Sequence, residues 1–313
     1  MTVYLNGEFL PEDEACLSPK DRGFLFSDGV YEALCAYDGR LFLADAHFAR
    51  LRHSLRKLRI DLDLSAERFA EVARTLVRQN DLDDQHAKIY LQVTRGAPPQ
   101  RRHAFPQQPI APTVYATASV YDLPETKWER GVKMLLCPDE RWGRCDIKSV
   151  SLLPNVLANE RAAEAGAFEA VLIRETEGDA NPVTEGSHSS FAVVVDEAVV
   201  THPLGPAILP GVTRGLVLRL ARERGLPVRE EPLPAQHLPA ADELFLMGTT
   251  TGVMPVVEGE AEAGVLGPKA TSWTVGDGRP GPVTRQLQEA FREAISSAQE
   301  TTLGDAAFLE AAA

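Results

Sequence analysis

Short apolar runs that fit β-strands alternate with amphipathic runs that fit helices along most of this chain, and this alternation constrains its fold most strongly. Beyond about residue 131, four strand patterns (VKMLLC, FEAVLIR, SFAVVV and ELFLMGT) are separated by helical patterns such as NVLANERAAEAG and TRGLVLRLARERG. A chain that alternates in this way buries its apolar faces by packing helices against a sheet. We therefore expect an α/β protein.

The first 120 residues combine hairpins with two amphipathic helices. The dipeptides Asn6-Gly7 and Asp38-Gly39 each lie between apolar runs, which predicts two hairpins. Apolar residues at helical spacing follow on two stripes, one through Phe48, Leu51, Leu55 and Leu58 and one through Phe69, Val72 and Leu76. KIYLQVT and PTVYATASV then fit strands, so this part predicts a small α+β domain.

The length of 313 residues favours two domains, because single cores stop growing near roughly 250–300 residues. The segment 121–131, YDLPETKWERG, has a proline, several charges and no periodicity, which is typical of a linker. We expect a first domain over 1–120, a larger domain with a mixed sheet over 132–298, which contains Lys148, and a flexible tail over 299–313.

The charge balance argues against several classes of partner. The net charge is −13, so the chain repels nucleic acid and anionic membranes. The start shows no signal-peptide pattern and no apolar run is long enough to cross a bilayer, so we expect a cytoplasmic protein. Four scattered cysteines lack zinc-site spacing, and no metal site is expected.

Common catalytic signatures are absent or out of place. The one G-x-G-x-x-G pattern, at Gly276, Gly278 and Gly281, leaves too few residues after it for a dinucleotide fold. We interpret it as a turn before a helix that starts at Pro282. The sequence contains no P-loop pattern and no G-x-S-x-G elbow, which leaves polar loops as the candidate sites.

Lys148 is the first candidate, in the loop RWGRCDIKSVSLLPNV. Only 7 lysines occur against 25 arginines, and Lys148 follows the apolar Ile147 and precedes a serine-rich turn. A desolvated lysine can attack a carbonyl group and form a Schiff base. The alternative is a solvated surface charge, which is the commoner state of a lysine.

Two further kinds of loop could bind a cofactor. Glu185 stands in NPVTEGSHSSF, where it would otherwise be an acidic turn residue. ILPGVTRG opens a helix at Thr213, and LFLMGTTTG ends a strand at Thr249–Thr251. Backbone amides and hydroxyls at such termini bind phosphate, although an N-cap and a simple turn would use the same residues.

Taken in order, several short segments resemble the class IV aminotransferases, the fold-type-IV pyridoxal-phosphate enzymes, and most closely the D-amino acid aminotransferases. These segments are DRGFLFSDGVYE, HFARL, VTRG, RRHAFP, RCDIKS, VTEGSHS, ILPGVTR and GTTT. Each is short, but their order over most of the chain is what identifies the family. The resemblance implies a two-domain fold with pyridoxal 5′-phosphate bound between the domains.

The resemblance also implies roles for individual residues. Lys148 is similar to the lysine that holds the cofactor as a Schiff base, and Glu185 to the carboxylate that pairs with the pyridine nitrogen and keeps it protonated. Leu209 corresponds to the apolar residue against the ring face. The remaining residues resemble the phosphate-binding set: Arg50, Val212, Thr213, Thr249 and Thr250.

Substrate recognition follows from the same resemblance. Tyr31, Arg101 and His103 are similar to the group that binds the substrate carboxylate in the D-amino acid enzymes, with Arg102 as a rival for Arg101 because the loop is one residue longer than expected. Cys35 and Ser190 depart from the family pattern, where lysine and asparagine are common. The substrates implied are small amino acids and 2-oxo acids, and the assembly implied is a homodimer.

The function implied is a ping-pong transamination between a D-amino acid, such as D-alanine or D-glutamate, and a 2-oxo acid. Branched-chain L-amino acid aminotransferases, (R)-amine transaminases and aminodeoxychorismate lyases share the lysine and the glutamate, so they remain alternatives. A catalytically silent binding protein is a further alternative. Intact Lys148 and Glu185 argue against it, because a silent relative needs neither.

Overall fold

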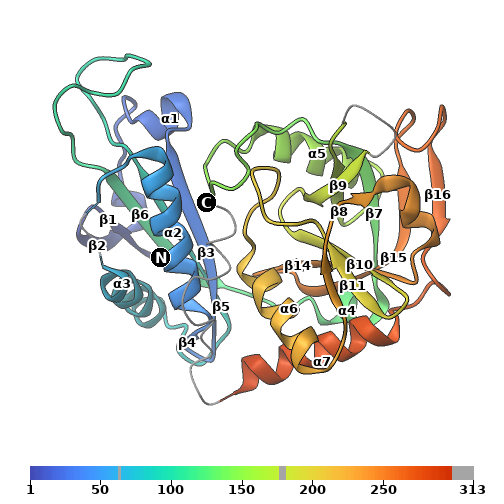
Figure 1. Cartoon of the computed structure of the whole chain (residues 1–313). Helices are drawn as coiled ribbons and strands as arrows, with labels where there is room; N and C mark the ends of the chain where they lie inside the picture. Colours follow the sequence, from blue (N-terminus) through green and yellow to red (C-terminus); the bar gives the residue numbers. More distant parts are fainter. Residues whose placement is uncertain (63–64, 176–180, 298–313) are drawn as a thin grey trace. The chain divides into compact units, whose positions relative to one another are not determined.

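The computed structural model describes residues 1–62, 65–175 and 181–297, which fall into two compact units (Figure 1). Among these residues the first unit contains Met1–Leu123 and Ile147–Ser151, and the second contains Pro124–Asp146 and Leu152–Ser297. The break after Leu123 lies inside the segment 121–131 that the sequence marks as a linker. The expected tail, 299–313, lies outside the described residues.

The first unit is built on a six-stranded antiparallel sheet in the order β2-β1-β6-β5-β3-β4. Its two hairpins turn at Asn6-Gly7 and Asp38-Gly39, where all four residues have positive φ as predicted for such turns. The strands are β1 (Thr2–Leu5), β2 (Glu8–Pro11), β3 (Gly29–Tyr37), β4 (Arg40–Leu41), β5 (Ala87–Thr94) and β6 (Thr113–Val120).

Two amphipathic helices, α2 (Ala44–Leu58) and α3 (Ala66–Gln79), pack against this sheet and against each other (Figure 1). Their predicted stripes form the core of the unit with strand residues such as Leu34 and Ile89. Burial of one such aliphatic side chain contributes roughly 1.5–3 kcal/mol, which holds the helices on the sheet. Two short helices, η1 (Glu12–Glu14) and α1 (Arg22–Phe26), precede β3.

The second unit contains a ten-stranded mixed sheet in the order β12-β11-β10-β14-β15-β7-β8-β9-β13, with β16 paired to β15. Parallel pairing joins β7 to β8 and β15, and β11 to β12. The strands are β7 (Val132–Pro138), β8 (Glu169–Ile173), β9 (Pro182–Gly186), β10 (Ser190–Val195), β11 (Ala198–Thr201), β12 (Val228–Glu230), β13 (Leu233–Pro234), β14 (Glu243–Gly248), β15 (Gly252–Ala261) and β16 (Thr271–Thr274).

Helices pack against the strands of this second sheet, so the predicted α/β class is confirmed. α5 packs on β7 and β8, α6 on β14, and α7 on β14 and β15. The helices are α4 (Glu125–Arg130), α5 (Leu153–Glu164), α6 (Val212–Glu223), η2 (Ala235–Ala240) and α7 (Pro282–Ser296). The segment 121–131, in which the sequence predicts a linker without periodicity, therefore contains the helix α4. Its Trp128 is buried and donates a hydrogen bond to the Thr251 carbonyl, which attaches the helix to the second unit.

The lysine segment belongs to the first unit, whereas the sequence placed it in the domain 132–298. Ser149 forms a bridge with Val30 of β3, and the Tyr31 N–H donates to the Lys148 carbonyl at 3.0 Å. The Lys148 N–H donates to the Ser54 hydroxyl of α2 at 3.1 Å. These are long-range backbone contacts, which the local sequence pattern does not encode.

Within the described ranges, no helix is long and apolar enough to cross a membrane. In the same ranges no group of three or more His, Cys, Asp or Glu side chains could hold a metal ion. The cytoplasmic location stays a prediction. Gly276 and Gly278 lie in a turn between β16 and α7, both with positive φ, and α7 begins at Pro282.

Candidate active site

Lys148 is half-buried beside the aromatic ring of Tyr31. Its Nζ lies 4.2 Å from the ring centroid, and Tyr31 itself stacks on Tyr90 at 5.7 Å. The flanking Ile147 and Ser149 are buried, so the backbone of this segment is fixed while the amine stays accessible. The arrangement suits a lysine whose amine is presented to a ligand rather than to bulk water.

Arg50 is a buried cation in the same unit, on α2. Its Nε and Nη2 donate to the two carboxylate oxygens of Glu32 at 2.7 and 2.9 Å, and His47 Nδ1 lies 2.9 Å from the same carboxylate. Burial alone would raise the pKa of Glu32, but the charge and hydrogen bonds of Arg50 and His47 lower it to about 2. The Glu32 carboxylate is therefore ionised and orients the Arg50 guanidinium.

Arg101 and His103 share one aromatic partner. The Arg101 guanidinium lies 4.6 Å from the ring centroid of Phe26, and the His103 ring lies 5.2 Å from the same centroid. The rival Arg102 is exposed, as Arg101 and His103 are, and its carbonyl accepts a hydrogen bond from Arg22. The structure thus brings two of the three predicted substrate ligands, Arg101 and His103, to one ring. The choice between Arg101 and Arg102 stays a prediction.

Glu185 occupies a buried position on β9 in the second unit. Arg141 Nη1 donates to its Oε1 at 2.5 Å, and the Leu209 N–H lies 3.0 and 3.1 Å from its two oxygens. Burial raises the pKa of Glu185, and the neighbouring Arg141 charge opposes that rise. Glu185 is therefore a partnered buried carboxylate and not a solvated turn residue.

Arg141 is itself held in place by Asp139. Its Nε and Nη2 donate to the two Asp139 oxygens at 2.9 and 3.0 Å, and Arg174 donates to the same carboxylate at 3.0 Å. The neighbouring carboxylates raise the pKa of Arg141 despite its burial, so it stays charged. The sequence analysis did not identify Arg141 or Asp139, because charged residues in a loop are usually solvated and nothing in the local pattern shows that these two are buried.

Leu209 lies just before the N-terminus of α6, which begins at Val212. The helix is capped by Gly211 without a side-chain hydrogen bond, and Val212 and Thr213 are buried there. A Cβ on Gly211 would collide with the Ser190 hydroxyl unless that side chain moved, so glycine leaves room at the start of the helix. A helix N-terminus with backbone N–H groups and a threonine hydroxyl is suited to bind phosphate.

Thr249 and Thr250 form the tight turn between β14 and β15 in the same unit. Thr251 is buried, and the Gly252 after it has φ of 63° and packs against the ring of Trp128. Thr249 and Thr250 remain half-buried, with both hydroxyls on a turn of fixed backbone. The turn has the chemistry of a second phosphate contact.

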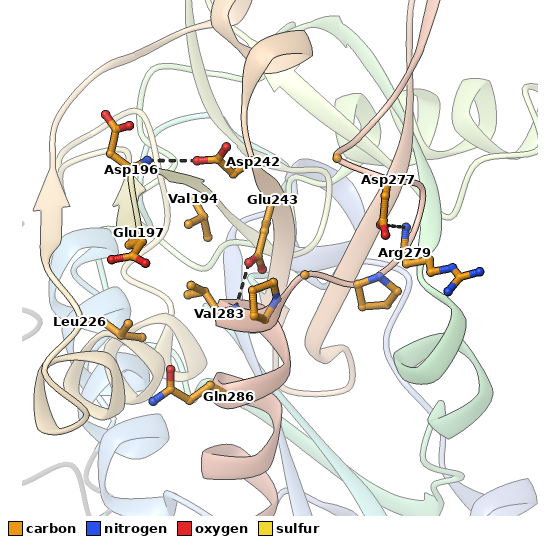
Figure 2. A pocket seen from close by; sticks show the side chains of 14 residues that line it. Val194, Asp196, Glu197, Leu226, Asp242, Glu243, Asp277, Arg279, Val283 and Gln286 are labelled. Atoms are coloured by element: carbon orange, nitrogen blue, oxygen red, sulfur yellow. Dashed lines mark hydrogen bonds between the residues drawn. The ribbon is translucent and has the colours of Figure 1, made fainter.

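A cavity of about 710 Å³ in the second unit is lined by none of the site residues described above (Figure 2). Its lining includes Asp196, Glu197, Asp242 and Asp277, and Glu243 there accepts hydrogen bonds from the first N–H groups of α7. Negative charge of this kind repels a phosphorylated cofactor. The cavity is therefore not the predicted cofactor site.

Each unit carries groups of the kind that a phosphorylated pyridine aldehyde requires. The first unit supplies an amine at Lys148 and a buried guanidinium at Arg50. The second supplies a buried carboxylate at Glu185, which suits a protonated ring nitrogen, and the N–H groups at the start of α6. The fit rests on the type and burial of these groups within each unit.

The fold and these groups define a class of protein, and the chain matches the family described as "Amino-transferase class IV" over residues 29–258. The chain belongs to this family and is an aminotransferase. It is 40% identical to the D-alanine aminotransferase of Staphylococcus haemolyticus over 94% of this chain and 98% of the relative. It is 38% identical to that of Bacillus licheniformis over 97% of this chain and 100% of the relative.

Solved structures show the same fold. The branched-chain amino acid aminotransferase from Escherichia coli has a TM-score of 0.80 at 24% identity, covering 97% of this chain and 99% of that one. The branched-chain aminotransferase from the archaeon Thermoproteus uzoniensis, solved with norvaline, has a TM-score of 0.78 at 24% identity and covers 96% of each chain. A further branched-chain amino acid aminotransferase, solved with pyridoxamine 5′-phosphate, has a TM-score of 0.78 at 25% identity and covers 97% of this chain and 98% of that one. At such identities the likeness concerns architecture, while substrate choice depends on a few side chains.

Proposed function

We propose that this aminotransferase transfers the amino group of a D-amino acid, such as D-alanine or D-glutamate, to a 2-oxo acid with pyridoxal 5′-phosphate as cofactor. The observation that carries the proposal is the pairing of Arg101 and His103 on the Phe26 ring. A guanidinium and an imidazole together can bind a carboxylate through charge-assisted hydrogen bonds. The relatives named D-alanine aminotransferase, at 38–40% identity, support the same interpretation.

Each residue has a defined task in this proposal. When bound, pyridoxal phosphate supplies an electron sink for the negative charge that develops at the substrate Cα. Lys148 provides the attachment point, and its freed Nζ accepts the Cα proton and delivers it onward. Glu185 holds a proton at the ring nitrogen, and Tyr31 lies beside the Lys148 amine.

The remaining residues bind and orient. Arg50, with the backbone and hydroxyls at Val212, Thr213, Thr249 and Thr250, holds the phosphate, and Leu209 packs on the ring. The substrate carboxylate is held by Arg101 and His103. Holding the cofactor by its phosphate and the substrate by its carboxylate orients the Cα–H bond toward Lys148, which is how positioning lowers a reaction barrier.

A direct assay tests the proposal against its rivals. The purified protein should transfer the amino group of D-alanine to 2-oxoglutarate far faster than that of L-leucine or (R)-phenylethylamine. Preference for L-leucine would favour the branched-chain alternative, and preference for the amine would favour an amine transaminase. Release of pyruvate from aminodeoxychorismate would identify a lyase.

The carboxylate ligands can be separated by kinetics. Arg101→Ala and His103→Ala should each raise KM for D-alanine and lower kcat/KM roughly ten- to a hundred-fold, since a hydrogen bond to a charged group is lost. The absorbance of the bound cofactor should not change. Arg102→Ala is the matched control on the same loop. A larger loss in Arg102→Ala would assign the role to Arg102 instead.

The assembly belongs to the same proposal. The first turns of α5 expose three large apolar side chains at helical spacing, Leu153, Val156 and Leu157, which are 68%, 58% and 54% exposed. An exposed apolar stripe of this kind is typical of a protein–protein contact. We propose that a second copy of the chain covers it in a homodimer.

A further inference from the structure

The loop between β5 and β6, residues 95–112, carries the proposed carboxylate ligands. Arg101, Arg102 and His103 are exposed and lie outside regular secondary structure. The two ends of the loop approach so closely that a Cβ on Gly96, whose φ is 95°, would collide with the Ala111 carbonyl. A long exposed loop samples many conformations unless other residues hold it. Its basic side chains therefore need an anchor to keep a fixed direction.

Arg22 supplies such an anchor from α1. Its side chain is buried, and its guanidinium donates from Nη1 to the carbonyl of Arg102 at 2.5 Å and from Nη2 to that of His103 at 3.1 Å. A longer contact at 3.4 Å reaches the Ala104 carbonyl. All three acceptors are backbone atoms. Arg22 thus holds the main chain of residues 102–104, next to the proposed ligands Arg101 and His103, independently of their side-chain conformations.

Asp28 links this anchor to the base of the loop. Its Oδ2 accepts hydrogen bonds from Arg22 Nε and Arg95 Nε, both at 2.7 Å, and Arg95 lies 3.7 Å from the ring centroid of Phe105 further along the loop. Burial would raise the pKa of Asp28, but the two arginines lower it, so the carboxylate is ionised. The guanidinium of Arg22 is therefore held by the Asp28 carboxylate at Nε and by the loop carbonyls at Nη1 and Nη2.

Phe26, one turn along α1 from Arg22, contacts the side chains of the two proposed ligands in the loop. Its ring contacts the guanidinium of Arg22 at 4.9 Å as well as Arg101 at 4.6 Å and the His103 ring at 5.2 Å. One aromatic ring thus contacts the anchor and both ligands. Residues of DRGFLFSDG, a segment for which sequence analysis gives no individual role, account for these contacts.

We infer that Arg22 is a positioning residue for substrate specificity, which holds the 101–104 backbone so that Arg101 and His103 present their side chains together to the substrate carboxylate. The inference rests on the proposed function. Arg22 acts through Arg101 and His103 in this inference and does not itself contact the substrate or the cofactor. Its loss should therefore weaken recognition of the carboxylate while leaving cofactor binding unchanged.

The test compares Arg22→Met, which removes every donor, with Arg22→Lys, which keeps the charge but has one donor nitrogen in place of the three that contact Asp28 and the loop carbonyls. Arg78→Met is the matched control, because Arg78 is exposed on α3 and, among the described contacts, its side chain bonds only to Thr75. Three quantities are measured on the cofactor-loaded protein: amide hydrogen exchange of residues 97–110, KM and kcat for D-alanine, and the dissociation constant of the cofactor.

In Arg22→Met we expect faster exchange confined to 97–110, KM for D-alanine raised about ten-fold or more, and an unchanged cofactor dissociation constant. Arg22→Lys should give a smaller change in the same direction, and it decides the matter if Arg22→Met does not fold. Unchanged exchange, or faster exchange with unchanged KM, would overturn the inference. If the unsubstituted enzyme transfers nothing from D-alanine, the proposed function and the carboxylate role both fail, while the exchange measurement still decides whether Arg22 anchors the loop.

Discussion

Glu185 keeps a carboxylate in a buried position because charged and polar partners surround it. Arg141 and the Leu209 N–H both donate to it, and Asp139 holds Arg141 in turn. A buried carboxylate without such partners would take up a proton and lose its charge. The network thus opposes the rise in the Glu185 pKa that burial causes, which favours the charged form that suits a protonated pyridine nitrogen.

Replacement of Glu185 by glutamine tests this role. Glu185→Gln should fold and bind cofactor but turn over at least ten-fold more slowly, since a neutral amide does not stabilise a proton on the ring nitrogen. Steady-state kcat and the cofactor dissociation constant are the measurements. Unchanged turnover would mean that Glu185 serves only as a structural partner of Arg141.

Lys148 is the second residue whose role can be isolated. The purified protein should be yellow, and borohydride reduction followed by peptide mapping should place the cofactor label on Lys148. Lys148→Ala should abolish transamination while cofactor still binds noncovalently. Lys133→Ala is the control, because Lys133 pairs with Glu260 at 2.6 Å on the second sheet. Label on Lys88 or Lys133 instead would refute the assignment.

At the scale of elements, the proposed phosphate ligands depend on backbone geometry more than on side chains. The β14–β15 turn presents Thr249 and Thr250 because Gly252 adopts a φ of 63° with the Trp128 ring against it. The start of α6 is open because Gly211 caps it without a side chain. The positive φ of Gly252 favours glycine there, and the absence of a Cβ at Gly211 leaves space beside Ser190.

Two glycine substitutions separate the cost of backbone strain at positive φ from the cost of a collision with a neighbouring side chain. Gly252→Ala and Gly225→Ala both place a Cβ at positive φ, but only the first meets a neighbour, the Trp128 ring. We expect Gly225→Ala to cost about 1 kcal/mol and Gly252→Ala about 1–3 kcal/mol more. Thermal unfolding with calorimetry measures both. Equal losses would show that Trp128 moves aside without cost.

At the scale of the whole molecule, the proposed homodimer has a measurable consequence. If a second copy covers the apolar stripe of α5, Val156→Asp should shift the protein toward monomer, because it would bury an unpaired charge. Specific activity should fall with dilution sooner than in the unsubstituted protein. Val120→Asp, at a 54% exposed valine of the first unit, is the control. Sedimentation velocity reports the assembly, and a dimer unaffected by Val156→Asp would place the interface elsewhere.

The sequence alone predicted the elements with strong local patterns. The hairpins at Asn6-Gly7 and Asp38-Gly39, the helices α2 and α3 and most strands of the second unit lie where periodicity and turn residues placed them. These features depend on neighbours within about ten residues, so a local pattern is sufficient. The order of short motifs predicted the family, which the comparisons confirm. Roles of single residues carried over by resemblance remain predictions.

Only the tertiary structure decided which side chains meet across large separations in the chain. Lys148 pairs through its backbone with β3, Arg141 is buried against Glu185, and Arg22 reaches the carbonyls of residues about 80 positions away. In the sequence these residues look like ordinary surface charges, because most lysines and arginines are solvated. Burial and ion pairing arise when distant elements pack together, and no local periodicity records that outcome. The sequence therefore determined the elements and the family, whereas packing determined which charges became part of the site.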